Sequence, residues 1–141
     1  MLKIAPGPNA ALAARYDLVR ALTVALTAPL SDADASVQSM PDASPAKWHL
    51  AHTTWFFETF VLRDHVDGYV LHDERFPFLF NSYYEAEGRR HARDRRGMIT
   101  RPTLDEVLAY RAYVDAALLA RLSSRRAASG TARHRYPAPV R

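Results

Sequence analysis

The stretch Ser44–Asp64, SPAKWHLAHTTWFFETFVLRD, decides the fold, because it joins helix-start signals to a dense set of aromatic side chains. Ser44 is a preferred N-cap residue, and a proline suits the next position, where its missing N–H has no partner to lose. We therefore expect one long central helix from Ser44 to about His65. On a 3.6-residue period, one face of this helix carries Trp48, His52, Trp55, Phe56 and Thr59.

His52 lies among these aromatic residues, and its surroundings allow two interpretations. A histidine in such a place is either a core residue with satisfied hydrogen bonds or a metal ligand in a dry pocket. His49 stands three residues away, so the two imidazoles can in principle share a metal ion on a helix. No two histidines stand four apart, so the H-x-x-x-H and H-E-x-x-H motifs of many metal centres are missing.

A first helix is expected before this stretch. Asn9 can cap it, and Pro29 prevents its continuation beyond about Ala28. A short helical turn around Ser31–Ala35 follows, because SDAD offers a cap and first-turn acids. We expect the apolar stripe of the first helix to face the core, and it consists of Leu12, Tyr16, Val19, Leu22 and Leu26.

A third long helix is expected from Thr103, which forms a T-x-x-E capping box with Glu106. Residues 69–102 separate it from the central helix, and so long an ordered connection is often functional. Its cluster of large apolar residues around Phe78 predicts that it packs against the core. The apolar stripe of the third helix consists of Val107, Tyr110, Val114, Leu118 and Leu122.

Three long helices without a strand predict an all-α fold, a helical bundle over residues 1–124. Residues 125–141 have the composition of a disordered tail. The tail holds five arginines and no acidic residue, so its charge alone exceeds the net charge of +4. The high pI therefore gives no reason to expect a nucleic-acid partner. With no cysteine and no apolar stretch long enough for a bilayer, we expect a cytoplasmic protein without disulfides or a membrane span.

The run SMPDASPAKWHLAHTTWFFE, residues 39–58, resembles the start of the iron-dependent sulfoxide synthases of ergothioneine biosynthesis. The N-terminal region of that family is a DinB-like helical bundle with the pattern SP-x-x-W-x-x-AH. A looser similarity extends from about Tyr16 to Leu122. The resemblance implies Fe(II)- and O2-dependent C–S bond formation between a cysteine-type thiol and N-trimethylhistidine. It also implies that His52 is one of three histidines that hold the iron.

The same resemblance implies an incomplete site. In the family the other two histidines belong to an HE-x-QH-x-E motif on a fourth helix, and this sequence contains no such motif. The family also has a C-terminal domain related to formylglycine-generating enzymes, which we expect this chain to lack. We therefore expect an incomplete, truncated bundle that lacks its fourth helix and is inactive alone.

Two further roles are expected near the long connection. The family holds the carboxylates of its thiol substrate with an R-x-x-R pair, and Arg90 and Arg93 match that spacing. Guanidinium groups suit carboxylates, although a solvated basic loop explains the same residues. Glu58 is expected either to accept a hydrogen bond from a ligand histidine or to pair with an arginine such as Arg63.

The alternative function is a non-catalytic helical module that serves as a scaffold or binds a partner. An apolar face without its fourth helix favours self-association or pairing with a helix of a separate chain. Nucleic-acid binding ranks last, because the basic residues lie in the connection and the tail and no recognition helix carries them.

Overall fold

The computed structural model describes residues 8–124, and within that range it consists of helices and connections without a β-strand. The prediction of an all-α fold with three long helices is thereby confirmed. The expectations for the tail 125–141 and for the missing fourth helix concern residues outside this range. In chain order the elements are α1 (Pro8–Thr27), α2 (Asp32–Ser36), α3 (Ala46–Phe57), the π-helical segment η1 (Glu58–Arg63), α4 (Phe76–Phe80), the 3₁₀ turns η2 (Glu85–Glu87) and η3 (Arg93–Met98), and α5 (Leu104–Ser124).

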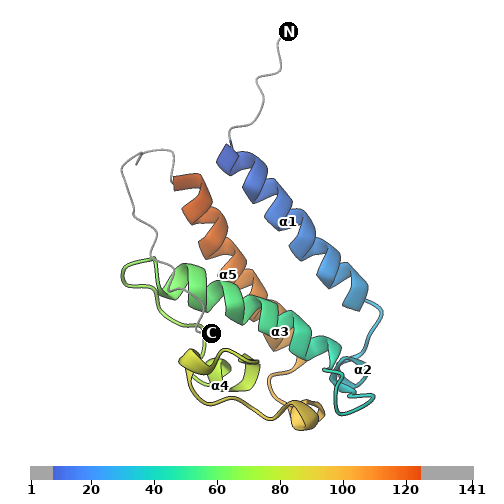
Figure 1. Cartoon of the computed structure of the whole chain (residues 1–141). Coiled ribbons are helices and arrows are strands. Elements are labelled where there is room, and N and C mark those ends of the chain that lie inside the picture. Colours follow the sequence, from blue (N-terminus) through green and yellow to red (C-terminus); the bar gives the residue numbers. More distant parts are fainter. Residues whose placement is uncertain (1–7, 125–141) are drawn as a thin grey trace, which may run out of the picture.

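The three long helices form one packed unit. Helices α1 and α5 run side by side in opposite directions, and α3 crosses in front of α5 (Figure 1). The long connection between η1 and α5 collects at one end of the bundle, where α4 packs against α3. The connection is therefore part of the folded unit, as its aromatic residues predict.

The helix starts follow the sequence signals at α5 but not at α3. At α5, Thr103 N donates to Glu106 Oε2 at 2.6 Å and Glu106 N donates to Thr103 Oγ1 at 3.2 Å, so the capping box is confirmed. At α3 the N-cap residue is Pro45. The predicted cap, Ser44, instead accepts a hydrogen bond from Arg96 Nη1 at 2.9 Å. The hydroxyl is used to hold a distant arginine rather than to start the helix.

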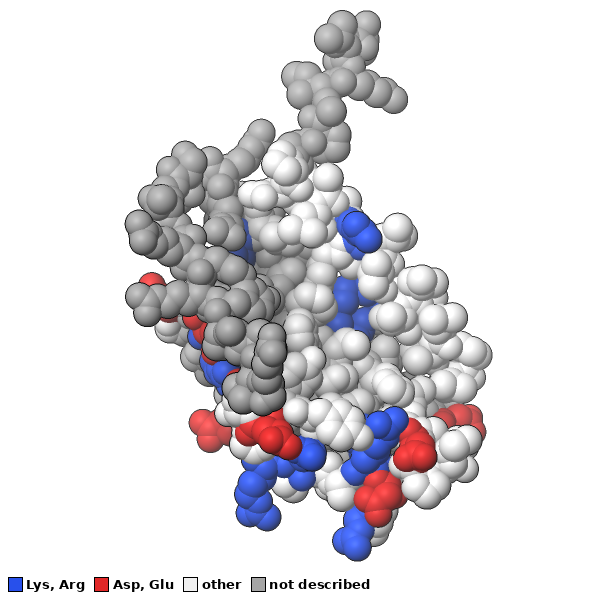
Figure 2. Space-filling model, in the orientation of Figure 1, with Lys and Arg blue, Asp and Glu red and all other residues white. Residues whose placement is uncertain are grey.

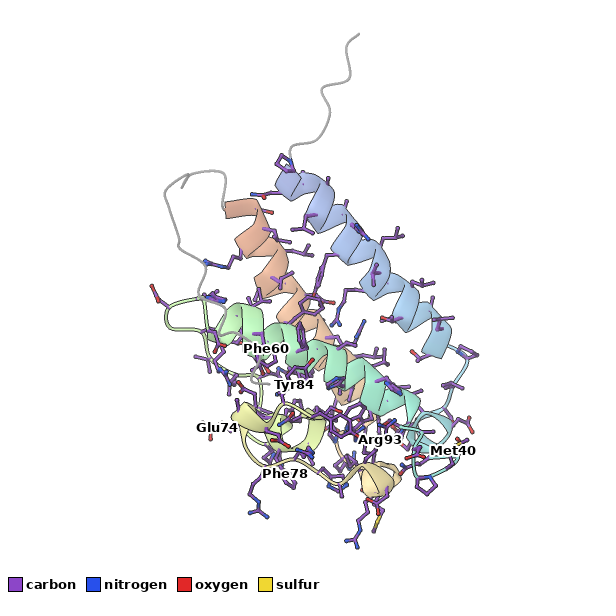
Figure 3. All side chains as sticks on the ribbon, viewed as in Figure 1. Met40, Phe60, Glu74, Phe78, Tyr84 and Arg93 are labelled. Carbon is purple, nitrogen blue, oxygen red and sulfur yellow. The ribbon has the colours of Figure 1, made fainter. Side chains whose placement is uncertain are left out.

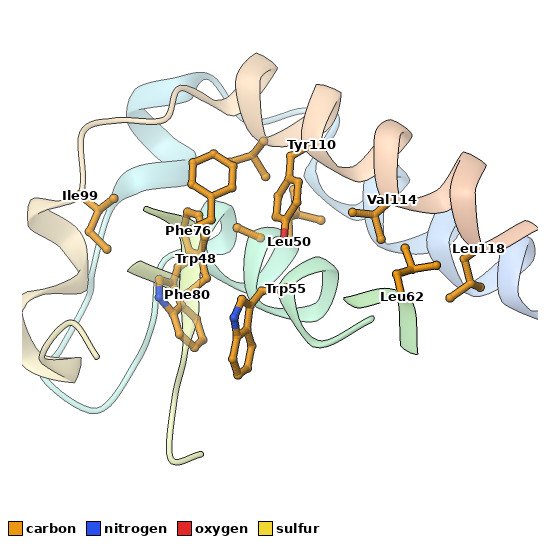
Figure 4. Packing of buried hydrophobic residues seen from close by; sticks show 12 residues of the cluster. Trp48, Leu50, Trp55, Leu62, Phe76, Phe80, Ile99, Tyr110, Val114 and Leu118 are labelled. Carbon is orange, nitrogen blue, oxygen red and sulfur yellow. The ribbon is translucent and has the colours of Figure 1, made fainter. Parts of the chain in front are cut away.

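The core lies between α3 and α5 (Figure 4). The predicted stripe on α5 is confirmed, because Val107, Tyr110 and Val114 are completely buried. Trp55 is completely buried on α3, as expected for a core residue. Phe76 and Phe80 of α4 complete this cluster, so the long connection supplies part of the core.

Glu58 is a completely buried acid at the point where α3 becomes η1. Its Oε1 accepts hydrogen bonds from Tyr69 Oη at 3.1 Å and His72 N at 2.9 Å, and its Oε2 accepts one from Tyr110 Oη at 2.5 Å. Neither role expected for Glu58 is observed. Arg63 pairs with Asp64 and Glu87 instead. The carboxyl group of Glu58 thereby links the end of α3 to the connection and to α5.

The orientation expected for α1 is wrong for four residues of its stripe, whereas the fifth, Tyr16, packs against the core as expected. Leu12, Val19, Leu22 and Leu26 were expected in the core, but they are 54%, 52%, 57% and 69% exposed. Leu18 adds to the same surface at 71% exposed. In Figure 2 the α1 side of the molecule correspondingly shows few charged side chains. We call this surface, made of Leu12, Leu18, Val19, Leu22 and Leu26, the α1 stripe.

The opposite face of α1 explains this orientation, because it packs through polar groups. Arg20 is buried, and its Nε donates to Asp115 Oδ1 at 2.8 Å. Arg111 of α5 is also buried, and its Nη2 donates to Thr23 Oγ1 at 2.6 Å. Buried guanidinium groups require such partners. These bonds therefore fix the polar face of α1 toward α5 and leave its aliphatic face outside.

We expect Trp55→Ala to lower the free energy of unfolding by about 3–5 kcal/mol, because it leaves a large cavity in the core. Urea unfolding followed by circular dichroism measures this change. Phe78→Ala serves as the control, because Phe78 is 42% exposed and its loss leaves no comparable cavity. Equal losses of stability in the two variants would contradict the assignment of Trp55 to the core.

Candidate functional site

His52 lies between the two tryptophans on one face of α3. The ring of Trp48 stacks on the imidazole with centroids 4.6 Å apart and planes at 14°. The ring of Trp55 lies on its other side, 5.6 Å away and at 19°. The spacing of 48, 52 and 55 along a helix brings these three side chains onto one face. They hold the plane of the imidazole in one orientation.

A hydrogen bond to α4 fixes the tautomer of His52. Its Nδ1 lies 2.7 Å from the carbonyl oxygen of Phe80. Because a carbonyl oxygen only accepts, Nδ1 carries the proton and Nε2 keeps its lone pair. Within residues 8–124, no hydrogen bond occupies Nε2. Metal-bound histidines commonly have this arrangement, in which one nitrogen donates to a carbonyl and the other binds the metal.

Arg96 extends the stack by one layer. Its guanidinium carbon lies 3.5 Å from the centroid of the Trp48 ring, on a side chain that is almost completely buried. The guanidinium donates to the hydroxyls of Ser44 and Ser82 and, among the residues described, forms no ion pair with a carboxylate. Burial lowers the pKa of Arg96 to about 10. A cation thus stacks directly against the tryptophan that covers His52.

These surroundings keep the imidazole neutral. Burial lowers the pKa of His52 below its ordinary value, and the charges of Arg96 and His49 lower it further against the opposing effect of the Phe80 carbonyl. The pKa of His49 is lowered by burial and by the charges of Arg96 and Arg93. A neutral imidazole with a lone pair on Nε2 is the form that binds metals.

The two arginines expected to bind substrate lie around Tyr83, not against His52. Arg93 Nε and Nη2 donate to the carbonyl of Asp42, at 3.0 and 2.5 Å, and Nη1 donates to Tyr83 Oη at 3.0 Å. The guanidinium of Arg90 lies 5.4 Å from the centroid of the Tyr83 ring. Both arginines are exposed. The guanidinium that reaches the His52 stack belongs to Arg96, which sequence reasoning missed, although R-x-x-R occurs again at 93–96.

Aromatic side chains of the connection and of η1 form the wall beside His52. The ring of Tyr84 lies 5.5 Å from that of Trp55 and 5.2 Å from that of Phe60 (Figure 3). The buried amide of Asn81 fixes this part of the connection, since its Nδ2 donates to Tyr84 O at 3.1 Å and its Oδ1 accepts from Tyr84 N at 3.3 Å. These aromatic rings border the imidazole of His52, which is partly buried, with the centroid of the Tyr84 ring 6.5 Å away.

The described residues do not complete a metal centre. From residue 8 to residue 124, no group of three or more histidine, cysteine, aspartate or glutamate side chains is placed to hold a metal ion. The imidazole of His52 is surrounded by aromatic rings, the Phe80 carbonyl and the charge of Arg96. This part of the chain therefore presents one oriented imidazole without a set of candidate ligands around it.

Comparison with known families agrees with the helical architecture. A family model for the DinB superfamily matches residues 15–141. The chain belongs to the DinB superfamily. The expected DinB-like fold is thereby confirmed, and the match includes all of α2 to α5 and continues beyond Ser124. No curated protein matches the chain. Among the helices of this DinB-superfamily chain that are described, none is long and apolar enough to cross a membrane.

We expect Arg96→Met to raise the pKa of His52 toward, but not up to, the ordinary 6.5, because the cation is lost while the burial remains. Titration of the imidazole by NMR measures the shift. Arg95→Met is the matched control, since Arg95 is an exposed neighbour. An unchanged pKa in Arg96→Met, or an equal rise in the control, would show that the Arg96 charge does not act on His52.

The same variant has an expected effect on stability. When folding lowers the pKa of a histidine, its contribution to the free energy of unfolding is complete at a pH above the pKa of the unfolded state. This contribution is lost as the pH falls through the pKa of the folded state. Lowering the pH from 7 to 5 should therefore destabilise the protein less in Arg96→Met than in the wild type.

Proposed function

We propose that this chain contributes one ligand, His52 Nε2, to an Fe(II) centre of the type used by the sulfoxide synthases of ergothioneine biosynthesis. The hydrogen bond from His52 Nδ1 to Phe80 O carries this proposal, because it leaves the metal-binding nitrogen deprotonated and oriented. The match of residues 44–52 to the pattern SP-x-x-W-x-x-AH supports it. The other ligands of such a centre have to come from outside residues 8–124 or from a second chain.

In the proposed reaction the S–H bond of a cysteine-type thiol and the imidazole C2–H bond of N-trimethylhistidine are replaced by a C–S bond, while one oxygen atom of O2 forms the sulfoxide and the other forms water. A bound iron would supply the activation of O2. We propose that Arg90 and Arg93 bind the carboxylates of the thiol substrate. Arg90 supports this best, because among the described residues its guanidinium is in contact with an aromatic ring and has no hydrogen-bonding partner. Arg93 already donates three hydrogen bonds to Asp42 and Tyr83, which leaves two of its five N–H groups for a carboxylate.

Anaerobic titration of the purified chain with Fe(II), followed by NMR of the histidine side chains, tests the metal ligand. We expect paramagnetic broadening centred on the His52 imidazole, with weak binding, because one imidazole holds a divalent metal poorly. His52→Ala should abolish this broadening, whereas His65→Ala, at an exposed position beyond η1, should leave it unchanged. Equal broadening of the His49 imidazole signals in wild type and His52→Ala would exclude His52 as the ligand.

The second candidate function is a helical module that associates through the α1 stripe. Its aliphatic residues are more than half exposed, and contiguous apolar surfaces of this kind commonly mark protein interfaces. Leu12, Val19 and Leu26 are spaced seven residues apart, symmetrically about Val19. An antiparallel pair of α1 helices about a twofold axis therefore places Leu12 against Leu26 of a second copy.

We expect the chain to form a dimer in a concentration-dependent manner in sedimentation experiments. Leu22→Lys should shift it to monomer, because it introduces a charge into the apolar contact. Ala21→Lys adds the same charge at an exposed position of α1 outside the stripe and should leave the dimer intact. A wild-type chain that stays monomeric at all concentrations would refute this candidate.

A further inference from the structure

A pocket lies between α4, the residues that precede it and the start of α5, and its lining does not include His52. Its volume is about 280 Å³. Phe76, Leu79 and Pro102 provide its apolar surface, and His72, Asp73, Arg75, Arg101 and Glu106 provide its polar wall. Its volume is close to the lower end of the range of small-molecule sites, and it combines an apolar surface with several charged side chains.

Helix α4 separates this pocket from His52. The carbonyl oxygens of Leu79 and Phe80 face α3, where they accept hydrogen bonds from Trp48 Nε1 at 3.0 Å and from His52 Nδ1 at 2.7 Å. The side chains of Phe76 and Leu79 instead line the pocket between α4 and α5. A ligand can therefore bind in the pocket whether or not a ligand is bound at His52.

The acidic groups of the pocket already have hydrogen-bond donors. Asp73 accepts from Arg75 Nε at 2.9 Å and from Arg75 Nη2 at 2.5 Å. Glu106 Oε2 accepts from Thr103 N at 2.6 Å in the capping box of α5. These bonds are the leading cause of the lowered pKa of each carboxyl group. Both acids are thus ionised and engaged within the protein.

The basic groups, in contrast, keep donors available. Arg101 approaches Glu106 only to 3.7 Å, and within the described range none of its nitrogens forms a hydrogen bond. The ring nitrogens of His72 are likewise without a hydrogen bond among these residues. Arg75 uses Nε and Nη2 for Asp73, which leaves its Nη1 as a donor among the described residues, and both Arg75 and Arg101 line the pocket. The pocket therefore has more available donors than acceptors.

We propose that this pocket binds a small organic anion, with its phosphate or carboxylate between Arg75 and Arg101 and its apolar part against Phe76, Leu79 and Pro102. Guanidinium groups bind both kinds of anion through paired N–H donors. His72, an exposed residue that lines the same pocket, adds a further polar contact through its imidazole. This proposal is independent of the iron site.

Isothermal titration with phenyl phosphate and with benzoate tests the pocket, because each probe carries one anionic group on an apolar ring. We expect saturable one-to-one binding of at least one probe, and the tighter probe assigns a phosphate or a carboxylate ligand. Arg75→Ala and Arg101→Ala should each weaken binding about tenfold, as charged hydrogen bonds do. These side chains are 82% and 76% exposed, so their removal leaves the fold intact. No saturable binding of either probe would overturn the proposal.

A matched control and a variant of opposite effect make the test specific. Arg95→Ala removes an exposed arginine elsewhere and should leave binding unchanged. An equal loss of binding would show nonspecific attraction and refute the site.

Glu106→Gln keeps a capping box, since glutamine serves there as well, but removes the negative charge beside Arg101. It should tighten binding about threefold. Glu85→Gln, also exposed, should have no effect, and weaker binding by Glu106→Gln would contradict the proposed position of the anion.

Discussion

The buried carboxyl group of Glu58 is the constraint on which the rest of the structure depends. A completely buried acid is costly unless several donors reach it, and none of its partners here is a cation. Tyr69 and the backbone of His72 come from the connection, and Tyr110 comes from α5. Satisfying one acid therefore brings three segments together. The connection is held at residues 69–72, and this places α4 against α3.

The position of α4 in turn determines the chemistry of His52. The carbonyl group of Phe80 can orient the imidazole only because α4 lies beside α3, and Trp48 Nε1 binds the adjacent carbonyl of Leu79. Two neighbouring carbonyls at the end of α4 thus fix two members of the stack. Arg96 then contributes a charge without a hydrogen bond to the imidazole, through contact with Trp48. The Phe80 carbonyl therefore sets the tautomer of His52, whereas burial and the charge of Arg96 lower its pKa.

Sequence reasoning was most accurate where the determinants are local. The capping box of Thr103 and Glu106 and the stripe on α5 depend on residues within a few turns, and both are observed. The α1 stripe shows the limit of this approach. Periodicity identifies the residues that share a face, but the partners of Arg20, which lie on α3 and α5, decide which face is buried. The role of Ser44 could not be predicted either, because its donor, Arg96, is 52 residues away.

The arginine series at 90, 93 and 96 illustrates how the site differs from its sequence pattern. Equal spacing makes the pairs 90–93 and 93–96 indistinguishable as R-x-x-R motifs. The structure separates them, because Arg93 and Arg96 both belong to the 3₁₀ turn η3, whereas Arg90 precedes it. Arg93 ends at the surface beside Asp42, whereas Arg96 is buried against Trp48. The same R-x-x-R spacing therefore holds one guanidinium at the surface and one in the His52 stack. Packing against Trp48, a residue far away in the sequence, decides which arginine is buried.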